Sequence, residues 1–189
     1  GCPFQGGDSP FNQYCQSGNR RNNDIWSAIR ILRPVAVVVS NLNYLYVRDI
    51  GLPNMPIGPT RVVWANETQK IFAQLQKLEI NGLLVQSVPE FASDVRYEET
   101  ILTQHVIGED RTVLNRGNEF LNKMDANAVM KVFDGRSILN LYRKFCTSDL
   151  CSQVKDGKFM YEDGSHLSSL GSMVVSPEVE QALRLLIQN

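Results

Sequence analysis

Apolar residues along this chain recur in two alternating patterns, one with the period of a helix and one in short unbroken runs. In "NNDIWSAIRILRP", Ile25, Ile29 and Leu32 lie at helical spacing. The segment opens with Asn and Asp residues suited to a helix cap, and it stops at Pro34. The run "VAVVVSNLN" that follows is β-branched and ends in polar residues, which is typical of a buried parallel strand. This part of the chain therefore predicts a helix followed by a strand.

The same alternation continues through the rest of the chain. "TQKIFAQLQKLEING" predicts a second helix, with Ile71, Leu75 and Leu78 on one face and Gly82 past its end. "LLVQSVPE" predicts a second buried strand that stops at Pro89. Five later segments predict two shorter helices, a third strand, a short fourth strand and a capped terminal helix, in the order "RYEETILTQHV", "GNEFLNKMDA", "AVMKVFD", "GKFMY" and "SPEVEQALRLLIQ".

Helices that alternate with short apolar strands favour a mostly parallel sheet covered by helices on both faces, which is an α/β fold. The 189 residues contain no internal repeat, low-complexity tract or obvious linker. They are enough for one domain with a core of its own. We therefore expect residues 1–189 to belong to one α/β domain.

Composition and charge narrow the class of protein. Apolar residues make up 43% and charged residues 21% of the chain, as in an ordinary globular protein. A net charge of −1 gives no reason to propose nucleic acid or an anionic membrane as a partner. No apolar run approaches the roughly 18 residues of a membrane span. The first residues do not form a signal peptide, so any export signal would have been removed or would lie upstream of residue 1.

Four cysteines favour an oxidising compartment. They allow three pairings, of which Cys2–Cys15 with Cys146–Cys151 is the simplest. Zinc is the competing interpretation, although the spacings C-x12-C and C-x4-C fit a zinc site poorly. "NET" at Asn66 is an acceptor for N-glycosylation and slightly favours a secretory route if the source is eukaryotic.

Candidate chemistry follows the predicted strands, because open α/β sheets gather functional groups at the carboxyl ends of their strands. Asn41 and Asn43 follow the first strand, and "SVPE" follows the second. Asp163 and His166 follow the fourth in "YEDGSHLS". An aspartate three residues before a histidine can fold back in a tight turn to fix the tautomer of a general base. The alternative for this pair is a polar turn in which Ser165 or Ser168 caps the following helix.

Two other polar residues have competing interpretations. Asn43 could donate its side-chain amide to an oxyanion, or it could simply form a turn. His105 has Glu109 and Asp110 nearby and could form a second acid–histidine pair. A histidine stabilised by a helix C-terminus is the favoured interpretation of His105.

"YEDGSHLSSLGS" resembles the last conserved block of the SGNH (GDSL-type) hydrolase superfamily. It is most similar to the extracytoplasmic SGNH domains fused to acyltransferase-3 membrane proteins, whose pattern is Y-x-D-x-x-H-L-S-x-x-G. "CTSDLCSQVKDGKFMY" resembles the disulfide-bearing loop before that block, and "GCPF…C" the N-terminal cysteine loop. "RPVAVVVSNLNYLY" and "LLVQSVPEF" resemble two strands of these domains. The resemblance covers nearly the whole chain and implies a flavodoxin-like, three-layer α/β/α fold.

Carried over by position, the resemblance makes His166 the general base, Asp163 its orienting carboxylate and Asn43 the oxyanion asparagine. The block around Asn43 departs from the family pattern G-x-N-D, because Asn41 replaces the glycine and Tyr44 replaces the aspartate. The oxyanion role of Asn43 is the weaker part of the assignment.

The nucleophile is harder to place. Ser9 lies in "GGDSP", which contains the family's G-D-S tripeptide, but only "GCPFQG" precedes it and Pro10 follows it. Only 34 positions separate Ser9 from Asn43, which is short for two crossover units. We interpret this tripeptide as a coincidence and expect the first strand and the true serine upstream of residue 1. The chain would then be the C-terminal part of its domain, with an upstream segment or another chain completing the sheet.

The resemblance implies O-acyl transfer, in particular of O-acetyl groups, or ester hydrolysis through a serine ester without a cofactor. The implied partners are an acylated carbohydrate or other small ester and an upstream segment or membrane acyltransferase domain of the same polypeptide. The implied location is extracytoplasmic, on the secreted, lumenal or periplasmic side. The alternative is a non-catalytic binding domain that kept the sheet and lost its nucleophile.

Overall fold

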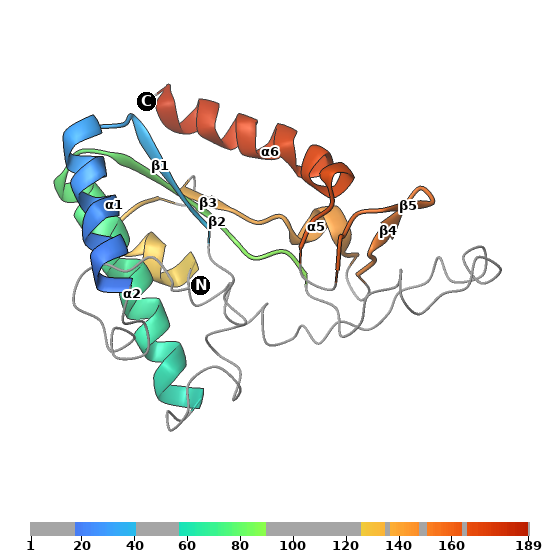
Figure 1. The fold of residues 1–189 in the computed structure, drawn as a ribbon, viewed down its shortest axis with the longest axis horizontal. Coiled ribbons are helices and arrows are strands. Elements are labelled where there is room, and N and C mark those ends of the chain that lie inside the picture. Colours follow the sequence, from blue (N-terminus) through green and yellow to red (C-terminus); the bar gives the residue numbers. More distant parts are fainter. Residues whose placement is uncertain are drawn as a thin grey trace.

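A computed structural model describes residues 18–40, 57–89, 126–134, 137–147, 151–163 and 166–188 of the chain. Figure 1 shows its helices and strands along the chain. Their bounds are α1 Gly18–Leu32, β1 Ala36–Ser40, α2 Ile57–Lys77, β2 Asn81–Val85, β3 Ile138–Leu139, α5 Tyr142–Phe145, β4 Val154–Lys155, β5 Lys158–Phe159 and α6 Ser169–Ile187.

The main sheet has the order β1-β2-β3, and both of its pairings are parallel. Val38 is opposite Leu83 in the first pairing, and Leu84 is opposite Ile138 in the second. Each parallel pair is joined by a long connection, and the connection from β1 to β2 contains α2. The predicted α/β class and parallel sheet are confirmed.

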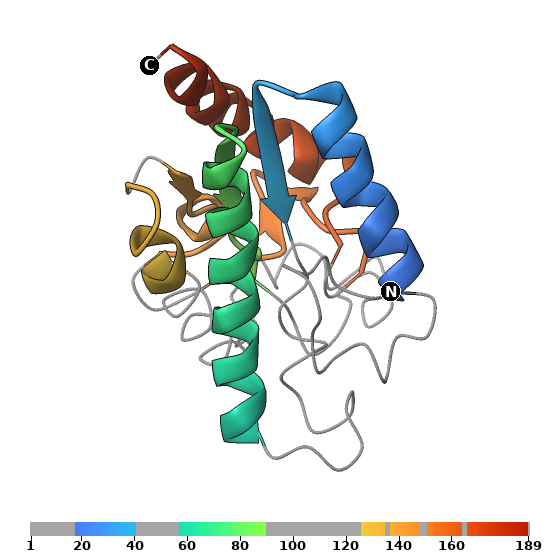
Figure 2. The ribbon, with the colours of Figure 1, turned by 90° about the vertical axis from the view of Figure 1, so that its left-hand side faces the viewer.

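Helices cover both faces of this sheet. The side chains of β2 alternate between the two faces, so both faces are apolar and need cover. Leu84 packs in one core, and Leu83 and Val85 pack in the other. Figures 1 and 2 show α1 and α2 on one face and α6 on the other. The α1–α2 core is formed by Trp26, Ile29, Val39, Ile71, Phe72, Leu75, Ile80, Leu84 and Val129. The α6 core is formed by Leu83, Val85, Leu141, Phe145, Met160, Tyr161, Val175 and Leu186.

Two predicted strands differ from the structure. "AVMKVFD" is not the third strand: residues 126–130 are helical, and Phe133 donates its backbone N–H to the Val129 carbonyl. Val129 is buried, and Phe133, four residues later, packs edge-on against Phe72. This tertiary packing at helical spacing overrides the strand preference of the β-branched residues. The third strand is β3, whose two residues are too few to form a recognisable pattern. "GKFMY" does form a strand, but β5 pairs antiparallel with β4 outside the main sheet.

Helix boundaries also differ from the sequence prediction. Helices α1 and α2 begin earlier than predicted, and Gly82 lies inside β2 and not merely beyond a helix. Helix α2 ends at Lys77, and Glu79, two residues later, adopts φ 57°. There Ile80 donates to the Leu75 carbonyl and Glu79 to the Gln76 carbonyl, which are the two bonds of a Schellman motif.

Some predicted elements cannot be compared with the structure. "RYEETILTQHV" and all but the last residue of "GNEFLNKMDA" lie outside the described residues. Within the described ranges, no helix is long and apolar enough to cross a membrane.

Candidate active site

The segment that leads to the candidate site begins with a disulfide. Cys146 and Cys151 are bonded, as predicted, and their backbones also form an antiparallel bridge. Ser152 donates its N–H to the Phe145 carbonyl at 2.8 Å, which closes the loop between the two cysteines. The described ranges contain no cluster of His, Cys, Asp and Glu that could hold a metal. Cys2 and Cys15 lie outside the described residues.

A two-residue hairpin follows the disulfide. Asp156 and Gly157 adopt φ values of 51° and 71°, and Lys155 is opposite Lys158 across the turn. Two consecutive positive φ values are those of a type I′ turn, for which Asp-Gly is a favoured sequence. The Asp-Gly dipeptide in "VKDGKF" is therefore the sequence signal for this hairpin.

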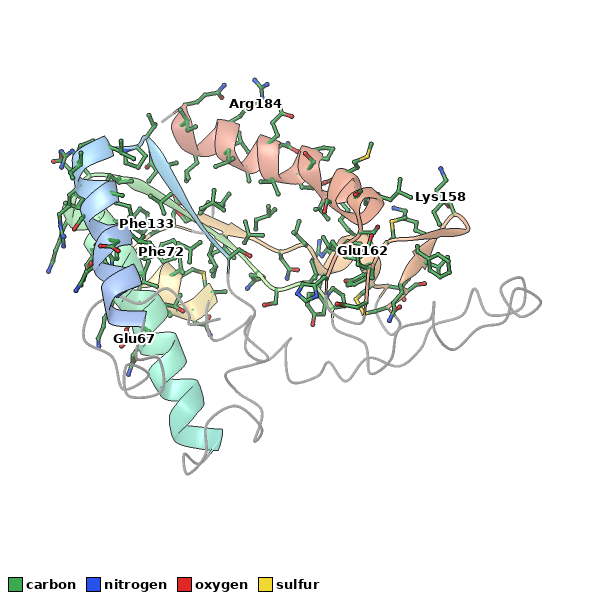
Figure 3. All side chains as sticks on the ribbon, in the orientation of Figure 1. Glu67, Phe72, Phe133, Lys158, Glu162 and Arg184 are labelled. Carbon is green, nitrogen blue, oxygen red and sulfur yellow. A yellow bond between two sulfur atoms is a disulfide. The ribbon has the colours of Figure 1, made fainter. Side chains whose placement is uncertain are left out.

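The Asp163–His166 segment forms a tight turn beyond this hairpin. Tyr161 and Leu167 form an antiparallel bridge across its base. Glu162 donates its N–H to the His166 carbonyl at 2.8 Å, and Ser168 donates its N–H to the Met160 carbonyl at 2.9 Å. Figure 3 shows Glu162 close to the start of α6. The base of the turn is thus closed by backbone hydrogen bonds.

Both carboxylate oxygens of Asp163 are engaged by His166. Oδ1 accepts the backbone N–H of His166 at 2.7 Å, and Oδ2 lies 2.7 Å from the ring Nδ1. Because an ionised carboxylate only accepts hydrogen bonds, this contact requires a proton on Nδ1. The basic nitrogen of the neutral ring is then Nε2. The predicted fold-back of the aspartate onto the histidine is therefore present.

The pair is open to solvent. The side chain of His166 is 68% exposed and that of Asp163 is 46% exposed. Solvent screens an ion pair at this exposure, so its contribution to stability is small. The contact nevertheless fixes the direction of the ring, and the ring itself is open to solvent.

Helix α6 fixes the turn against the rest of the domain. The Ser168 hydroxyl donates to the Phe159 carbonyl at 2.9 Å and accepts the Gly171 N–H at 3.1 Å, which makes Ser168 the helix cap. This confirms Ser168 as one of the two predicted caps, although the helix begins at Ser169 and continues through Pro177. In Figure 1, α6 starts beyond the ends of β2 and β3 and runs back over the sheet. The helix therefore brings His166 to the carboxyl end of the sheet.

An ion pair ties the short helix α5 to α6. Lys144 Nζ contacts Glu178 Oε1, and both side chains are about one-third exposed or less. The hydrogen bond from Lys144 lowers the pKa of Glu178, and the positive charge of Lys155 adds to this effect. This pair could not be predicted from the sequence, because its partners lie on helices separated by the hairpin and the turn.

The other predicted site residues remain untested. Ser9, Asn41, Asn43, Tyr44 and His105 lie outside the described residues. Asn66 is exposed on α2, so its side chain is accessible, but its glycosylation stays a prediction. Of the predicted catalytic and oxyanion residues, the described part of the chain thus contains Asp163 and His166.

Comparisons with known proteins identify the family and support the fold. A family model described as "SGNH domain (fused to AT3 domains)" matches residues 1–181. The chain is also similar to a solved structure, "Structure of Salmonella ser. Paratyphi A lipopolysaccharide acetyltransferase periplasmic domain", with a TM-score of 0.61 and 15% identity. The match covers 88% of this chain and 63% of that one, so the chain spans less than two thirds of its structural relative. A search of curated proteins found no match.

Proposed function

This chain belongs to the family of SGNH domains fused to AT3 domains, and we propose that Asp163 and His166 are the acid–base half of a serine acyl-transfer site. The observation that carries the proposal is the double engagement of Asp163 by the His166 backbone and ring, each at 2.7 Å. A carboxylate held by both contacts fixes the tautomer and the orientation of the imidazole together.

In the proposed reaction, His166 Nε2 accepts the hydroxyl proton of a serine as that oxygen attacks the ester carbonyl of the donor. The Asp163 carboxylate stabilises the imidazolium that forms. The imidazolium then returns the proton to the departing alkoxide, which leaves an acyl-serine. An acceptor hydroxyl or water next attacks this ester, with His166 again taking the proton. Asn43 and backbone amides are the proposed donors to the oxyanion.

We place the nucleophile on a strand outside the described residues. Among the described strands, only β2 pairs with β1; Val38 in β1 and Val35 just before it are 45% and 62% exposed. Figure 2 shows β1 between α1 and α2. An edge strand with exposed valines is suited to accept another strand. We propose that polypeptide upstream of Gly1, or another chain, supplies that strand together with the serine.

The proposed substrate is an O-acyl, in particular O-acetyl, ester on a carbohydrate or other small alcohol. The support is the structural relative, whose title names a lipopolysaccharide acetyltransferase periplasmic domain. The family description supports a membrane acyltransferase domain in the same polypeptide as the proposed partner. We accordingly propose an extracytoplasmic location, with which the Cys146–Cys151 disulfide is consistent.

Two substitutions in the intact protein test the proposed roles. His166→Gln removes the base, and Asp163→Asn replaces the acceptor with an amide that no longer stabilises the imidazolium. With p-nitrophenyl acetate as the probe, we expect kcat to fall by roughly 10³-fold or more in each variant. Glu162→Gln is the matched control, because this adjacent carboxylate is exposed and has no role in the proposed reaction.

Retention of full activity by His166→Gln would remove this histidine from the mechanism. If the parent protein, correctly folded, neither hydrolyses the ester nor transfers its acyl group, the non-catalytic binding domain becomes the better account. Equal losses in Glu162→Gln and Asp163→Asn would mean that a general change in charge, and not the Asp163–His166 contact, affects the activity.

A further inference from the structure

Three short antiparallel pairings run in series from the disulfide to the Asp163–His166 turn. The first is the bridge between Cys146 and Cys151, and the second is the β4–β5 hairpin. The third is the Tyr161–Leu167 bridge at the base of the turn. We call the described residues 145–147, 151–163 and 166–168, which contain these pairings, the antiparallel ladder.

Met160 connects the second and third pairings. Its N–H donates to the Gln153 carbonyl at 2.7 Å, and its carbonyl accepts the Ser168 N–H at 2.9 Å. Met160 and Gln153 are both buried, so neither hydrogen bond can readily be replaced by one to water. A displacement of the segment after Cys151 is therefore transmitted through Met160 to the base of the turn.

A second connection runs through side chains. Phe145, next to the disulfide, packs edge-on against Tyr161 with the ring centroids 5.4 Å apart. Both rings are buried in the α6 core, and Tyr161 is two residues before Asp163. The disulfide is thus joined to the aspartate by backbone hydrogen bonds and by a packed aromatic pair.

We propose that the Cys146–Cys151 disulfide is a positioning element for His166, acting through the antiparallel ladder and the Phe145–Tyr161 contact. The inference rests on the proposed function only for its effect on catalysis. The exposed ring of His166 has little packing of its own, so its orientation depends on the contact with Asp163 and on the backbone that supports the turn. Removing the covalent end of the ladder lets that backbone sample other positions.

The test uses the intact protein with both cysteines replaced, Cys146→Ser/Cys151→Ser, so that no lone thiol remains. The first readout is the imidazole ¹⁵N spectrum of histidine-labelled protein, which distinguishes a proton on Nδ1 from one on Nε2. The signal that disappears in His166→Gln is assigned to His166. We expect the Nδ1–H form of His166 to dominate in the parent protein and to lose population in the double variant.

The second readout is the kinetics with p-nitrophenyl acetate. A misplaced base affects the chemical step more than ground-state binding, so kcat should fall roughly 10- to 100-fold, because a displacement of about 1 Å can cost 100-fold. KM should change much less. If the role of the disulfide is purely structural, its removal should lower the unfolding temperature and leave both the His166 tautomer and the kcat of the folded protein unchanged.

Two further variants separate positioning from stability. Phe145→Leu keeps the disulfide but removes the ring contact with Tyr161. We expect a smaller shift of the His166 tautomer in the same direction. This variant also tests the proposal if the double variant does not fold. Phe72→Leu lies in the core on the other face of the sheet and is the stability control. It should lower the unfolding temperature without changing the His166 spectrum.

An unchanged His166 tautomer in folded Cys146→Ser/Cys151→Ser would overturn the proposal, as would an equal change in Phe72→Leu. A shifted tautomer with unchanged kcat would support the positioning role and contradict the proposed catalytic role of His166. The spectrum and the kinetics therefore distinguish failure of this inference from failure of the proposed function.

Discussion

Gly171 lies directly against the backbone carbonyl of Met160, with no space for a side chain between them. A Cβ at position 171 would overlap the Met160 oxygen, which is the acceptor for the Ser168 N–H. The first turn of α6 is thus in backbone contact with the base of the Asp163–His166 turn. The glycine that ends "HLSSLG" is therefore required at this position by the close packing.

Gly171→Ala should therefore destabilise the protein, by roughly 1–3 kcal/mol, because a methyl group must displace a buried carbonyl. The sign of the change in unfolding free energy is informative, because in an uncrowded helix alanine is about 1 kcal/mol more favourable than glycine. Urea unfolding gives the free energy. Ser172→Ala, at the exposed next position of α6, is the control and should change stability little. A stabilised Gly171→Ala would contradict the close contact.

Ser168→Ala should lower the free energy of unfolding by about 1–2 kcal/mol, because it removes the cap of α6. The same substitution breaks the hydroxyl bond to the Phe159 carbonyl, so activity should fall as well as stability. Ser168→Thr keeps a hydroxyl that can make both bonds and should restore most of the loss. Ser169→Ala is the matched control, because Ser169 is exposed and is not the cap. Thermal unfolding and ester hydrolysis together measure the effect.

The Lys144–Glu178 ion pair should make stability depend on pH in the acidic range. Because Lys144 lowers the pKa of Glu178 in the folded protein, the pair stabilises the fold above the ordinary pKa of glutamate. That contribution is lost as the pH falls through the lowered pKa. Lys144→Met should therefore be less stable than the parent at pH 7, and the difference should shrink toward pH 3.

Urea midpoints across this pH range measure the effect. The control is Lys158→Met on the hairpin, because Lys158 does not contribute to the lowered pKa of Glu178. A difference that stays constant with pH would show that Lys144 stabilises α5 and α6 only through its methylene groups.

Glu79→Gly should stabilise the protein by about 0.5–1 kcal/mol. Glu79 holds φ 57° at the end of α2, where a residue with a Cβ is strained and glycine is not. Its side chain is exposed, so its loss removes little packing. Lys77→Gly, two residues earlier and inside the helix, should instead destabilise by about 1 kcal/mol. Opposite signs for the two substitutions in denaturant unfolding would confirm the Schellman ending.

Several parts of the fold could be predicted from local sequence because they depend on local rules. The valines of β1 form a β-branched run, and Ile71 and Leu75 lie at helical spacing and are buried. The "AVMKVFD" segment was misassigned because Val129, Val132 and Phe133 are β-formers in composition, whereas their i, i+3, i+4 spacing fits the observed helical turn. Strand β3 could not be predicted, since two residues carry no period.

The candidate site was predictable only in part. The spacing of Asp163 and His166 fits a fold-back turn, and Ser168 precedes a glycine-containing helix start, so these residues could be found locally. The bond from Met160 to Gln153, the Phe145–Tyr161 contact and the Lys144–Glu178 pair depend on how the hairpin folds back on α5 and α6. Such contacts arise from tertiary packing, which neither periodicity nor capping rules describe.

The most direct test of the central claim is fluorophosphonate labelling of the intact protein, followed by peptide mapping of the modified residue. Our account predicts one labelled serine, upstream of residue 1 or on a partner chain, with labelling lost in His166→Gln and retained in Glu162→Gln. Labelling of Ser9 would contradict our interpretation of its G-D-S tripeptide. Undiminished labelling in His166→Gln would contradict the claim that Asp163 and His166 activate the nucleophile.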